Sequence, residues 1–189
     1  MKKILFVAAM LMLGTQAQAA NLALTGTASQ SSTGYWDGGA SASRAIDGNT
    51  DGSFWNSSVS HTDNEQGASW QVDLGSMSNI DQIDLWNRTD CCDARLADFT
   101  VSIFDAALST IWSQVFSGAA GTHEIFNTGS VLGQIVKIQL NGTNYLQLAE
   151  VQVFGNNVSA VPVPAALFLF APALLGFLGL RRKSVLNVA

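Results

Sequence analysis

The middle of the chain consists of short runs in which apolar and polar residues alternate. A period of two is typical of β-strands that bury one face. The runs are separated by Gly, Asn, Asp and Ser, and no long helical periodicity interrupts them. They lie at residues 70–74, 83–85, 99–103, 111–116, 136–140 and 151–153. The pattern predicts one all-β domain over residues 20–155, a sandwich or jelly roll.

The two ends of the chain break this pattern and are expected to be targeting segments. Residues 1–19 combine a basic start, an apolar run and the cleavage pattern Ala17-Gln18-Ala19, as in a secretory signal peptide. After an expected linker at 156–160, a transmembrane helix is expected at 165–180, followed by a basic cluster that favours the cytoplasmic side. An uncleaved N-terminal anchor and a plain C-terminal anchor are the alternatives.

The C-terminal segment 161–189 resembles a known bacterial sorting signal. Val161-Pro162-Val163-Pro164-Ala165-Ala166-Leu167 is similar to the PEP-CTERM signal in its VPxPAAL-type form, with Val163 in place of the usual glutamate. The resemblance implies an exosortase-type protease as a processing partner. It also implies a protein that is anchored transiently in the membrane and then moves to the cell surface or extracellular matrix.

The charge of the domain differs from that of the whole chain. Five of the nine cations lie in the two ends, so four cations stand against fourteen acidic residues in the body, a formal charge of −10. An acidic body argues against the binding of nucleic acid, which requires clustered Lys and Arg. It also argues against the binding of anionic lipid headgroups.

Candidate chemistry is concentrated between residues 61 and 95. His61 stands in a polar loop, and two of the four body cations, Arg88 and Arg95, lie in one segment after a predicted strand. Arginine and histidine offer hydrogen-bond donors that suit the hydroxyl groups of a sugar. Asp90 is expected to orient an arginine or to fix the turn. The alternative is that both arginines are solvated surface residues.

The only two cysteines, Cys91 and Cys92, are neighbours in the same segment. In an oxidising compartment adjacent cysteines can form a disulfide, which would be a stiff apolar ridge beside the arginines. Their spacing is poor for zinc and lacks the Cys-x-x-Cys pattern of redox sites. Intermolecular disulfides remain an alternative.

Four segments of the body resemble a discoidin-type domain, also known as the coagulation factor 5/8 C domain. Together they span residues 21–155, which is essentially the whole body. They are Asn21–Leu24 with Ala28–Ser32, Arg44–Gly52, Trp70–Gly75 and Leu148–Gly155.

Within that superfamily the chain resembles the fucolectins, or F-type lectins. Their motif is His, 26 residues, Arg-x-Asp, four residues, Arg, and His61, Arg88-Thr89-Asp90 and Arg95 have this spacing. The resemblance implies a jelly-roll β-sandwich of the galactose-binding-domain type. It implies L-fucose or a similarly configured sugar as the ligand, held by His61, Arg88 and Arg95, with a Cys91–Cys92 disulfide against the apolar face of the sugar.

The same resemblance implies a structural calcium ion. Oxygen ligands of this kind suit Ca²⁺, although Asx turns that cap a loop are the alternative interpretation. The implied ligands are the side chains of Asp47, Asn49, Ser58 and Glu150 and the backbone carbonyls of Arg44 and Ala149.

These features predict a secreted or surface-displayed bacterial lectin that binds fucosylated glycans and is not an enzyme. The alternatives are a matrix or adhesion protein with a non-fucose ligand and a non-catalytic module that assists polysaccharide processing. A glycoside hydrolase is disfavoured because no recognisable carboxylate pair is found. Of the remaining aromatic residues, Trp70 and Trp86 are expected to be core or half-buried. Trp36 and Trp55 are expected to pack in the core or in loops, with stacking on further sugar residues as the alternative, and His123 is expected at the surface without a companion.

Overall fold

The computed structural model describes residues 19–34 and 39–158. The segment 1–18, Trp36 and the expected sorting tail at 161–189 lie outside the described residues. Among the residues it does describe, no helix is long and apolar enough to cross a membrane. The described residues form an all-β sandwich, as the alternating runs predict.

The strands differ greatly in length, and the helical segments are short 3₁₀ turns. The main strands are β1 (Ala20–Asn21), β2 (Thr27–Gln30), β5 (Ser69–Trp86), β6 (Ala97–Phe104), β7 (Thr110–Ala119), β8 (His123–Leu140) and β11 (Glu150–Asn157). The short strands are β3 (Ser60–His61), β4 (Glu65–Gln66), β9 (Thr143–Asn144) and β10 (Gln147–Leu148). The 3₁₀ turns are η1 (Leu22–Thr25), η3 (Ala42–Ile46), η4 (Phe54–Asn56) and η5 (Asp93–Arg95).

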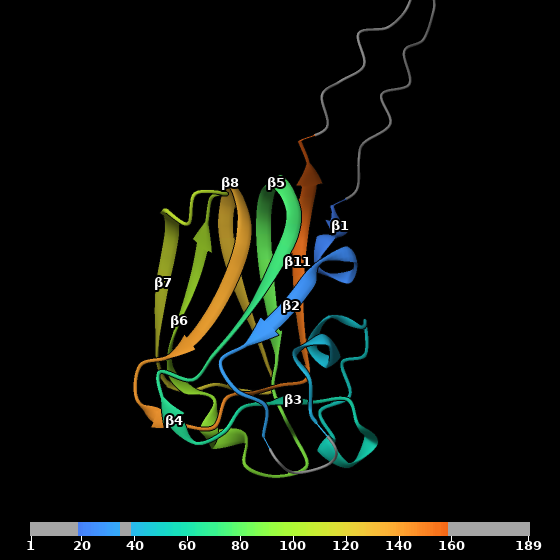
Figure 1. Ribbon diagram of the computed structural model, residues 1–189, viewed down its shortest axis with the longest axis vertical. Helices are drawn as coiled ribbons and strands as arrows, with labels where there is room; N and C mark the ends of the chain where they lie inside the picture. The colour runs from blue at the N-terminus through green and yellow to red at the C-terminus, as the bar shows by residue number, and fades with distance from the viewer. Residues whose placement is uncertain (1–18, 35–38, 159–189) are drawn as a thin grey trace, which may run out of the picture. The chain divides into compact units, whose positions relative to one another are not determined.

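Two long antiparallel strands, β5 and β8, hold the sandwich together. Each turns over at one end of the domain and so contributes to both layers (Figure 1). The first half of β5 pairs with β2 and with the second half of β8, which also pairs with β6. The second half of β5 pairs with β11 and with the first half of β8. The outer strands β1 and β7 complete the order β1-β11-β5-β8-β6-β7.

The core lies between the two layers and is formed by the alternating apolar positions. Trp70 and Val72 face inward from the first half of β5, and Ile83 and Leu85 do so from the second half. Trp70 is almost fully buried, and its indole N–H donates to the Ala42 carbonyl at 2.9 Å, so its one polar group is satisfied. Full burial of such a side chain stabilises the fold by about 2 kcal/mol.

Two local expectations from the sequence differ from the structure. The runs at 70–74 and 83–85 belong to the single strand β5, because the chain bends at Gly75 (φ +79°) without ending its pairing with β8. β11 continues to Asn157, so the first two residues of the expected linker are in a strand.

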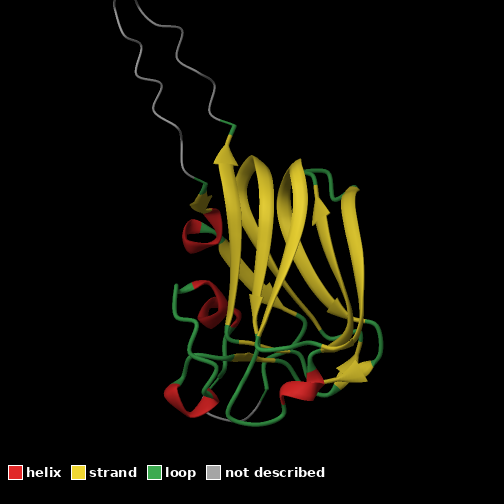
Figure 2. Ribbon diagram, turned by 180° about the vertical axis from the view of Figure 1, so that it is seen from behind, coloured by secondary structure: helices red, strands yellow, loops and turns green. Residues whose placement is uncertain are grey.

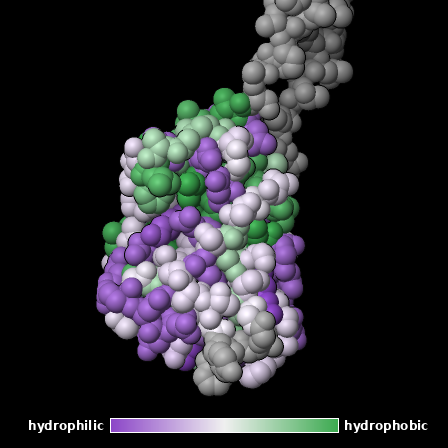
Figure 3. Space-filling model, viewed as in Figure 1, coloured by the Kyte–Doolittle hydropathy of each residue, from purple (hydrophilic) through white to green (hydrophobic). Residues whose placement is uncertain are grey.

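The connecting loops gather at the end of the sandwich opposite the bend of β5 and β8. Figure 2 shows η3, η4 and η5 at this end, around the small strands. On the face drawn in Figure 3, hydrophilic residues gather over the loop end and hydrophobic residues over the other end. The sandwich therefore carries one polar cluster of loops at this end.

Gly155 provides a test of the packing between β11 and β5. It is buried at a register shift of β11, where an added Cβ would collide with the backbone carbonyl of Asn79. We expect Gly155→Ala to lower the free energy of unfolding by about 2 kcal/mol, the usual cost of overpacking, measured by urea denaturation. Gly142→Ala is the control, since an added Cβ there meets no atom within 4 Å; equal stability of both variants would contradict this packing.

Candidate functional site

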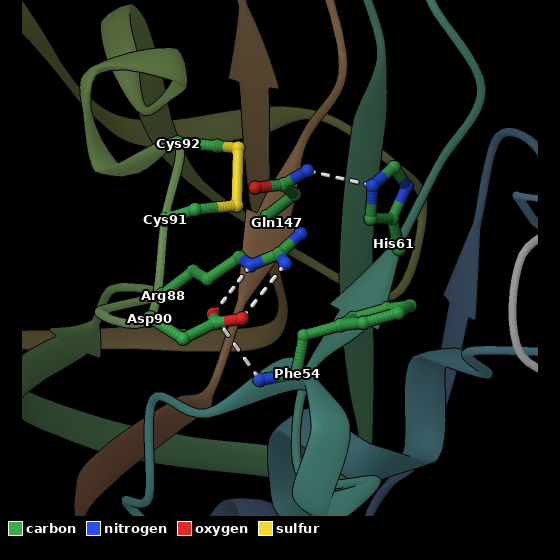
Figure 4. The surroundings of a disulfide bond; sticks show 7 residues. All are labelled: Phe54, His61, Arg88, Asp90, Cys91, Cys92 and Gln147. Carbon is green, nitrogen blue, oxygen red and sulfur yellow. Dashed lines mark hydrogen bonds and ion pairs between the residues drawn. A yellow bond between two sulfur atoms is a disulfide. The ribbon is translucent and has the colours of Figure 1, made fainter.

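Arg88 is the buried charge at the centre of the loop end. Only 5% of the residue is exposed, and its Nε and Nη2 donate to the two carboxylate oxygens of Asp90 at 2.7 and 3.0 Å. The Arg88 guanidinium lowers the pKa of Asp90 to about 2, chiefly through these hydrogen bonds. Asp90 also accepts a bond from the Phe54 backbone N–H at 3.3 Å, and the Arg88 guanidinium lies 4.5 Å from the Phe54 ring centroid. The carboxylate thus orients the arginine and holds η4 against it (Figure 4).

His61 faces the same space from β3, which is paired with β10. The residue is 4% exposed, and its ring packs edge-on against Phe54 and Tyr145, with centroids 5.5 and 5.3 Å away. Nδ1 lies 2.6 Å from the Thr62 carbonyl oxygen and Nε2 lies 2.6 Å from the amide nitrogen of Gln147. Burial lowers the pKa of His61, and the nearby Arg88 and Arg95 lower it further. His61 is therefore neutral near pH 7.

Arg95 approaches from the other side of the space. It ends the 3₁₀ turn η5 and is half-buried, and its guanidinium lies 4.5 Å from the ring centroid of Tyr145. The two arginines therefore each lie on one aromatic ring, with His61 between the rings. Stacking on a ring restricts a flexible guanidinium and adds a cation–π attraction of about 0.5–1 kcal/mol.

The three motif residues line one open pocket of about 290 Å³. Its lining is made of His61, Arg88, Arg95, Phe54, Trp55 and Tyr145. The structure thus brings together the three residues that the sequence motif predicted as sugar contacts. It adds three aromatic residues that the motif does not contain, and Trp55 is 78% exposed rather than packed in its loop. In the sequence, the adjacent aromatic pair Phe54-Trp55 in a polar loop is the one signal that points to two of these aromatic residues.

Cys91 and Cys92 form a disulfide with each other. It lies beside Arg88 and Gln147 at the rim of the site (Figure 4) but is not among the residues that line the pocket. Cys92 adopts a left-handed backbone with φ of 62°, and its carbonyl accepts the Arg95 N–H at 3.0 Å. The pair therefore also fixes the start of the turn that carries Arg95.

Asn87 attaches this segment to the sandwich. It is 2% exposed, its side-chain amide donates to the carbonyls of Asp93 and Gly121 at 3.0 and 3.2 Å, and its backbone N–H bonds to Thr122. The bond to Asp93 closes the loop on itself, and the bonds to Gly121 and Thr122 tie Asn87 to the connection between β7 and β8. No feature of the sequence pattern had pointed to this residue.

The residues implied for calcium lie beside β11. Glu150 is fully buried; its Oε1 accepts the Gly48 N–H at 3.1 Å, while its Oε2 has no partner among the described residues. Burial raises the pKa of Glu150 to about 7. Asp47 and Asn49 accept backbone N–H groups two residues ahead, as in Asx turns. The buried Ser58 hydroxyl lies within hydrogen-bond distance of two loop carbonyl oxygens, those of Asp51 and Ser53. Within residues 19–34 and 39–158 no group of three His, Cys, Asp or Glu side chains could hold a metal.

Two of the implied calcium ligands would act through backbone carbonyls. Ala149 is fully buried and precedes Glu150, and its N–H bonds to Trp86. Arg44 is half-buried in η3, which packs against β11. The structure thus places both residues on segments that meet near Glu150, and the bond between Gly48 and Glu150 joins those segments.

His123 has companions, contrary to the sequence-based expectation. Its ring stacks on Trp86 with centroids 4.0 Å apart, and its Nε2 lies 3.0 Å from an Asp84 carboxylate oxygen. Neighbouring strands β5 and β8 place Trp86 directly opposite His123, a pairing that depends on the register. Trp86 is half-buried and Trp70 is in the core, as expected.

The sandwich topology and the loop-end pocket define a galactose-binding-like domain. A family model described as "NedA-like, galactose-binding domain" matches residues 44–138, half of the chain. Fucolectin-6 from Anguilla japonica is 35% identical over 138 residues, 70% of this chain and 74% of that protein. The chain therefore belongs to the fucolectin, or F-type lectin, family.

Solved structures agree with this family. The lectin domain of lectinolysin complexed with Lewis B antigen is 36% identical with a TM-score of 0.68, covering 72% of this chain and 97% of that one. A fucose-binding module from Streptococcus pneumoniae is 29% identical with a TM-score of 0.69, covering 73% and 99%. A family 32 module from C. perfringens in complex with galactose, at 20% identity and a TM-score of 0.58, shares the fold.

The Arg88–Asp90 pair predicts a specific pH dependence of stability. Because the pKa of Asp90 is lowered in the folded state, its contribution is present above the unfolded value and is lost as pH falls from about 4 toward about 2. We expect Asp90→Asn to lower the free energy of unfolding by about 1–2 kcal/mol at neutral pH, and this difference to shrink in acid. Denaturation of both proteins across this range measures it. Asp81→Asn, which removes a carboxylate from β5, is the control. An equal, pH-independent loss in both variants would contradict the assignment.

Proposed function

We propose that the domain binds fucosylated glycans through L-fucose or a similarly configured sugar in the His61–Arg88–Arg95 pocket. The observation that carries the proposal is the convergence of these three residues, 27 and seven positions apart in the sequence, on one pocket lined with aromatic rings. Relatives that bear the names fucolectin and fucose-binding module support the ligand class.

The chemistry of the pocket suits a neutral sugar. Two of the five Arg88 N–H groups are used by Asp90, which leaves donors for ligand hydroxyls. Bonds from a charged donor are stronger than neutral ones and help a small ligand to compete with water. The rings of Phe54 and Tyr145 can contact the apolar face of the sugar. The carboxylate of this cluster, Asp90, is already committed to Arg88, which favours binding over acid–base catalysis.

Trp55 extends the pocket outward. Its indole is 78% exposed beside the lining residue Phe54, with ring centroids 5.7 Å apart. An exposed indole next to a monosaccharide pocket suits contact with the next sugar of a glycan. We therefore include a longer glycan, rather than fucose alone, in the proposed ligand.

We also propose a structural calcium ion, and the buried carboxylate of Glu150 is the observation that supports it. A fully buried carboxylate oxygen without a partner is costly unless a cation compensates for it. The side-chain oxygens of Asp47, Asn49 and Ser58 and the carbonyls of Arg44 and Ala149 would complete a set of hard ligands. Such an ion would hold the loop between Asp47 and Ser58 to β11, and through it the neighbouring strand β3.

Display outside the cell is the remaining part of the proposal. The signal-peptide pattern at residues 1–19 and the sorting-signal resemblance at 161–189 support secretion and processing by an exosortase-type protease. The Cys91–Cys92 disulfide fits an oxidising compartment. The setting would be the cell surface or the extracellular matrix of a bacterium.

A glycan array with the purified protein tests the ligand. We expect selective binding to fucosylated glycans, and a loss of at least about 30-fold in affinity for L-fucose by calorimetry in Arg95→Ala, since two charge-assisted bonds are worth at least about 2 kcal/mol. Lys137→Ala removes a cation from the sheet instead and should bind normally. Folded protein that binds only other glycans would favour an adhesion protein with a non-fucose ligand; undiminished fucose binding by Arg95→Ala would refute the site.

Thermal unfolding with and without calcium tests the metal. We expect millimolar calcium to raise the melting temperature and EDTA to reverse this, because the ion neutralises the buried Glu150 carboxylate. Glu150→Gln should abolish the calcium response and, in EDTA near about pH 8, be at least as stable as the wild type, since a neutral amide costs less to bury. A calcium response that survives in Glu150→Gln would place the ion elsewhere.

A further inference from the structure

Both ring nitrogens of His61 are already hydrogen-bonded inside the protein. Nδ1 lies 2.6 Å from the Thr62 carbonyl oxygen, which can only accept, so Nδ1 must carry a proton. A neutral imidazole has one proton, and its Nε2 is then an acceptor. The backbone therefore selects the tautomer in which His61 cannot donate from Nε2 to a ligand.

Gln147 meets this acceptor from the opposite strand. It is directly paired with His61 in the β3–β10 register and is only 1% exposed. Its amide nitrogen is 2.6 Å from His61 Nε2, while its Oε1 is buried without a partner among the described residues. Figure 4 shows the amide between His61 and the disulfide, with its nitrogen toward the ring.

The reverse orientation of the Gln147 amide would require a charged histidine. If Oε1 faced Nε2, both ring nitrogens would have to donate, and His61 would be an imidazolium. The charged groups around the ring are Arg88 and Arg95, which oppose a further positive charge, and Asp63, which favours it; Tyr145 packs edge-on against the ring. The Asp90 carboxylate is committed to Arg88. Burial and two adjacent guanidinium groups therefore favour the neutral ring.

We propose that Gln147 is a positioning residue that holds His61 as a neutral acceptor, so that the pocket takes up ligand hydroxyls that donate to Nε2. The positive charge of the site then resides on the two arginines alone. A ligand hydroxyl reaches Nε2 only as a donor, in exchange with the amide of Gln147. This consequence for the ligand rests on the proposed function, whereas the state of His61 does not.

Nitrogen NMR of the histidine rings in the full-length protein tests the state of His61 directly. The chain has two histidines, so His123 serves as an internal reference. We expect His61 to show the Nδ1–H form with a pKa below the ordinary value of about 6.5, and Gln147→Glu to raise that pKa by more than about one unit, because a carboxylate stabilises the imidazolium. Gln114→Glu, on the exposed β7, adds the same charge as a control and should leave His61 unchanged.

The wild-type spectrum decides the proposal even if Gln147→Glu fails to fold. An Nε2–H tautomer, or a His61 pKa at or above about 6.5, would overturn it, as would equal shifts in the two glutamate variants. In the same samples, L-fucose affinity should change less than about twofold between about pH 6 and 8 in the wild type. It should fall more than about fivefold toward the lower pH in Gln147→Glu, as the acceptor is lost. A neutral His61 without fucose binding would refute the proposed function and leave the role of Gln147 standing.

Discussion

The loop end depends on one requirement, that the buried guanidinium of Arg88 be paired. A charge that is 5% exposed is costly to remove from water, and Asp90 compensates for it with two hydrogen bonds. The same carboxylate accepts the Phe54 N–H, which brings the aromatic loop against the arginine. Because the Arg88 guanidinium lies on the Phe54 ring, the pairing also shapes one wall of the pocket. The pairing that compensates the charge of Arg88 therefore also builds the candidate ligand site.

The sequence predicts that the fold is all-β, but it does not predict how the strands are connected. Alternation identified the inward positions of β5, β6 and β11, because burial of one face imposes a period of two. Alternation cannot tell whether two runs belong to one strand. Gly75 permits a left-handed bend, and pairing with β8 on both sides of it keeps Ser69–Trp86 continuous. Such pairing is a long-range property that local sequence does not express.

The residues of the candidate site could also be predicted only in part. The spacing of His61, Arg88 and Arg95 predicted three polar residues that the fold brings into one pocket, because a motif records residues that meet in the fold. Tyr145 and Gln147 carry no such signal. The short β3–β10 pairing, across more than eighty positions, brings Tyr145 to the pocket and Gln147 to the ring of His61. The sequence leaves open whether Trp55 packs in its loop or reaches outward, because its exposure depends on the direction of η4 rather than on local composition.

The pairing of β1 with β11 has a mechanical consequence. Ala20 lies opposite Gly155, so the domain begins and ends on neighbouring strands, at the end remote from the pocket (Figure 1). A pull between a ligand held in the loops and an attachment after Asn157 would run along the strands. β11 is hydrogen-bonded to β1 and β5 across that direction. The load would then fall on many bonds in shear at once rather than opening them one by one.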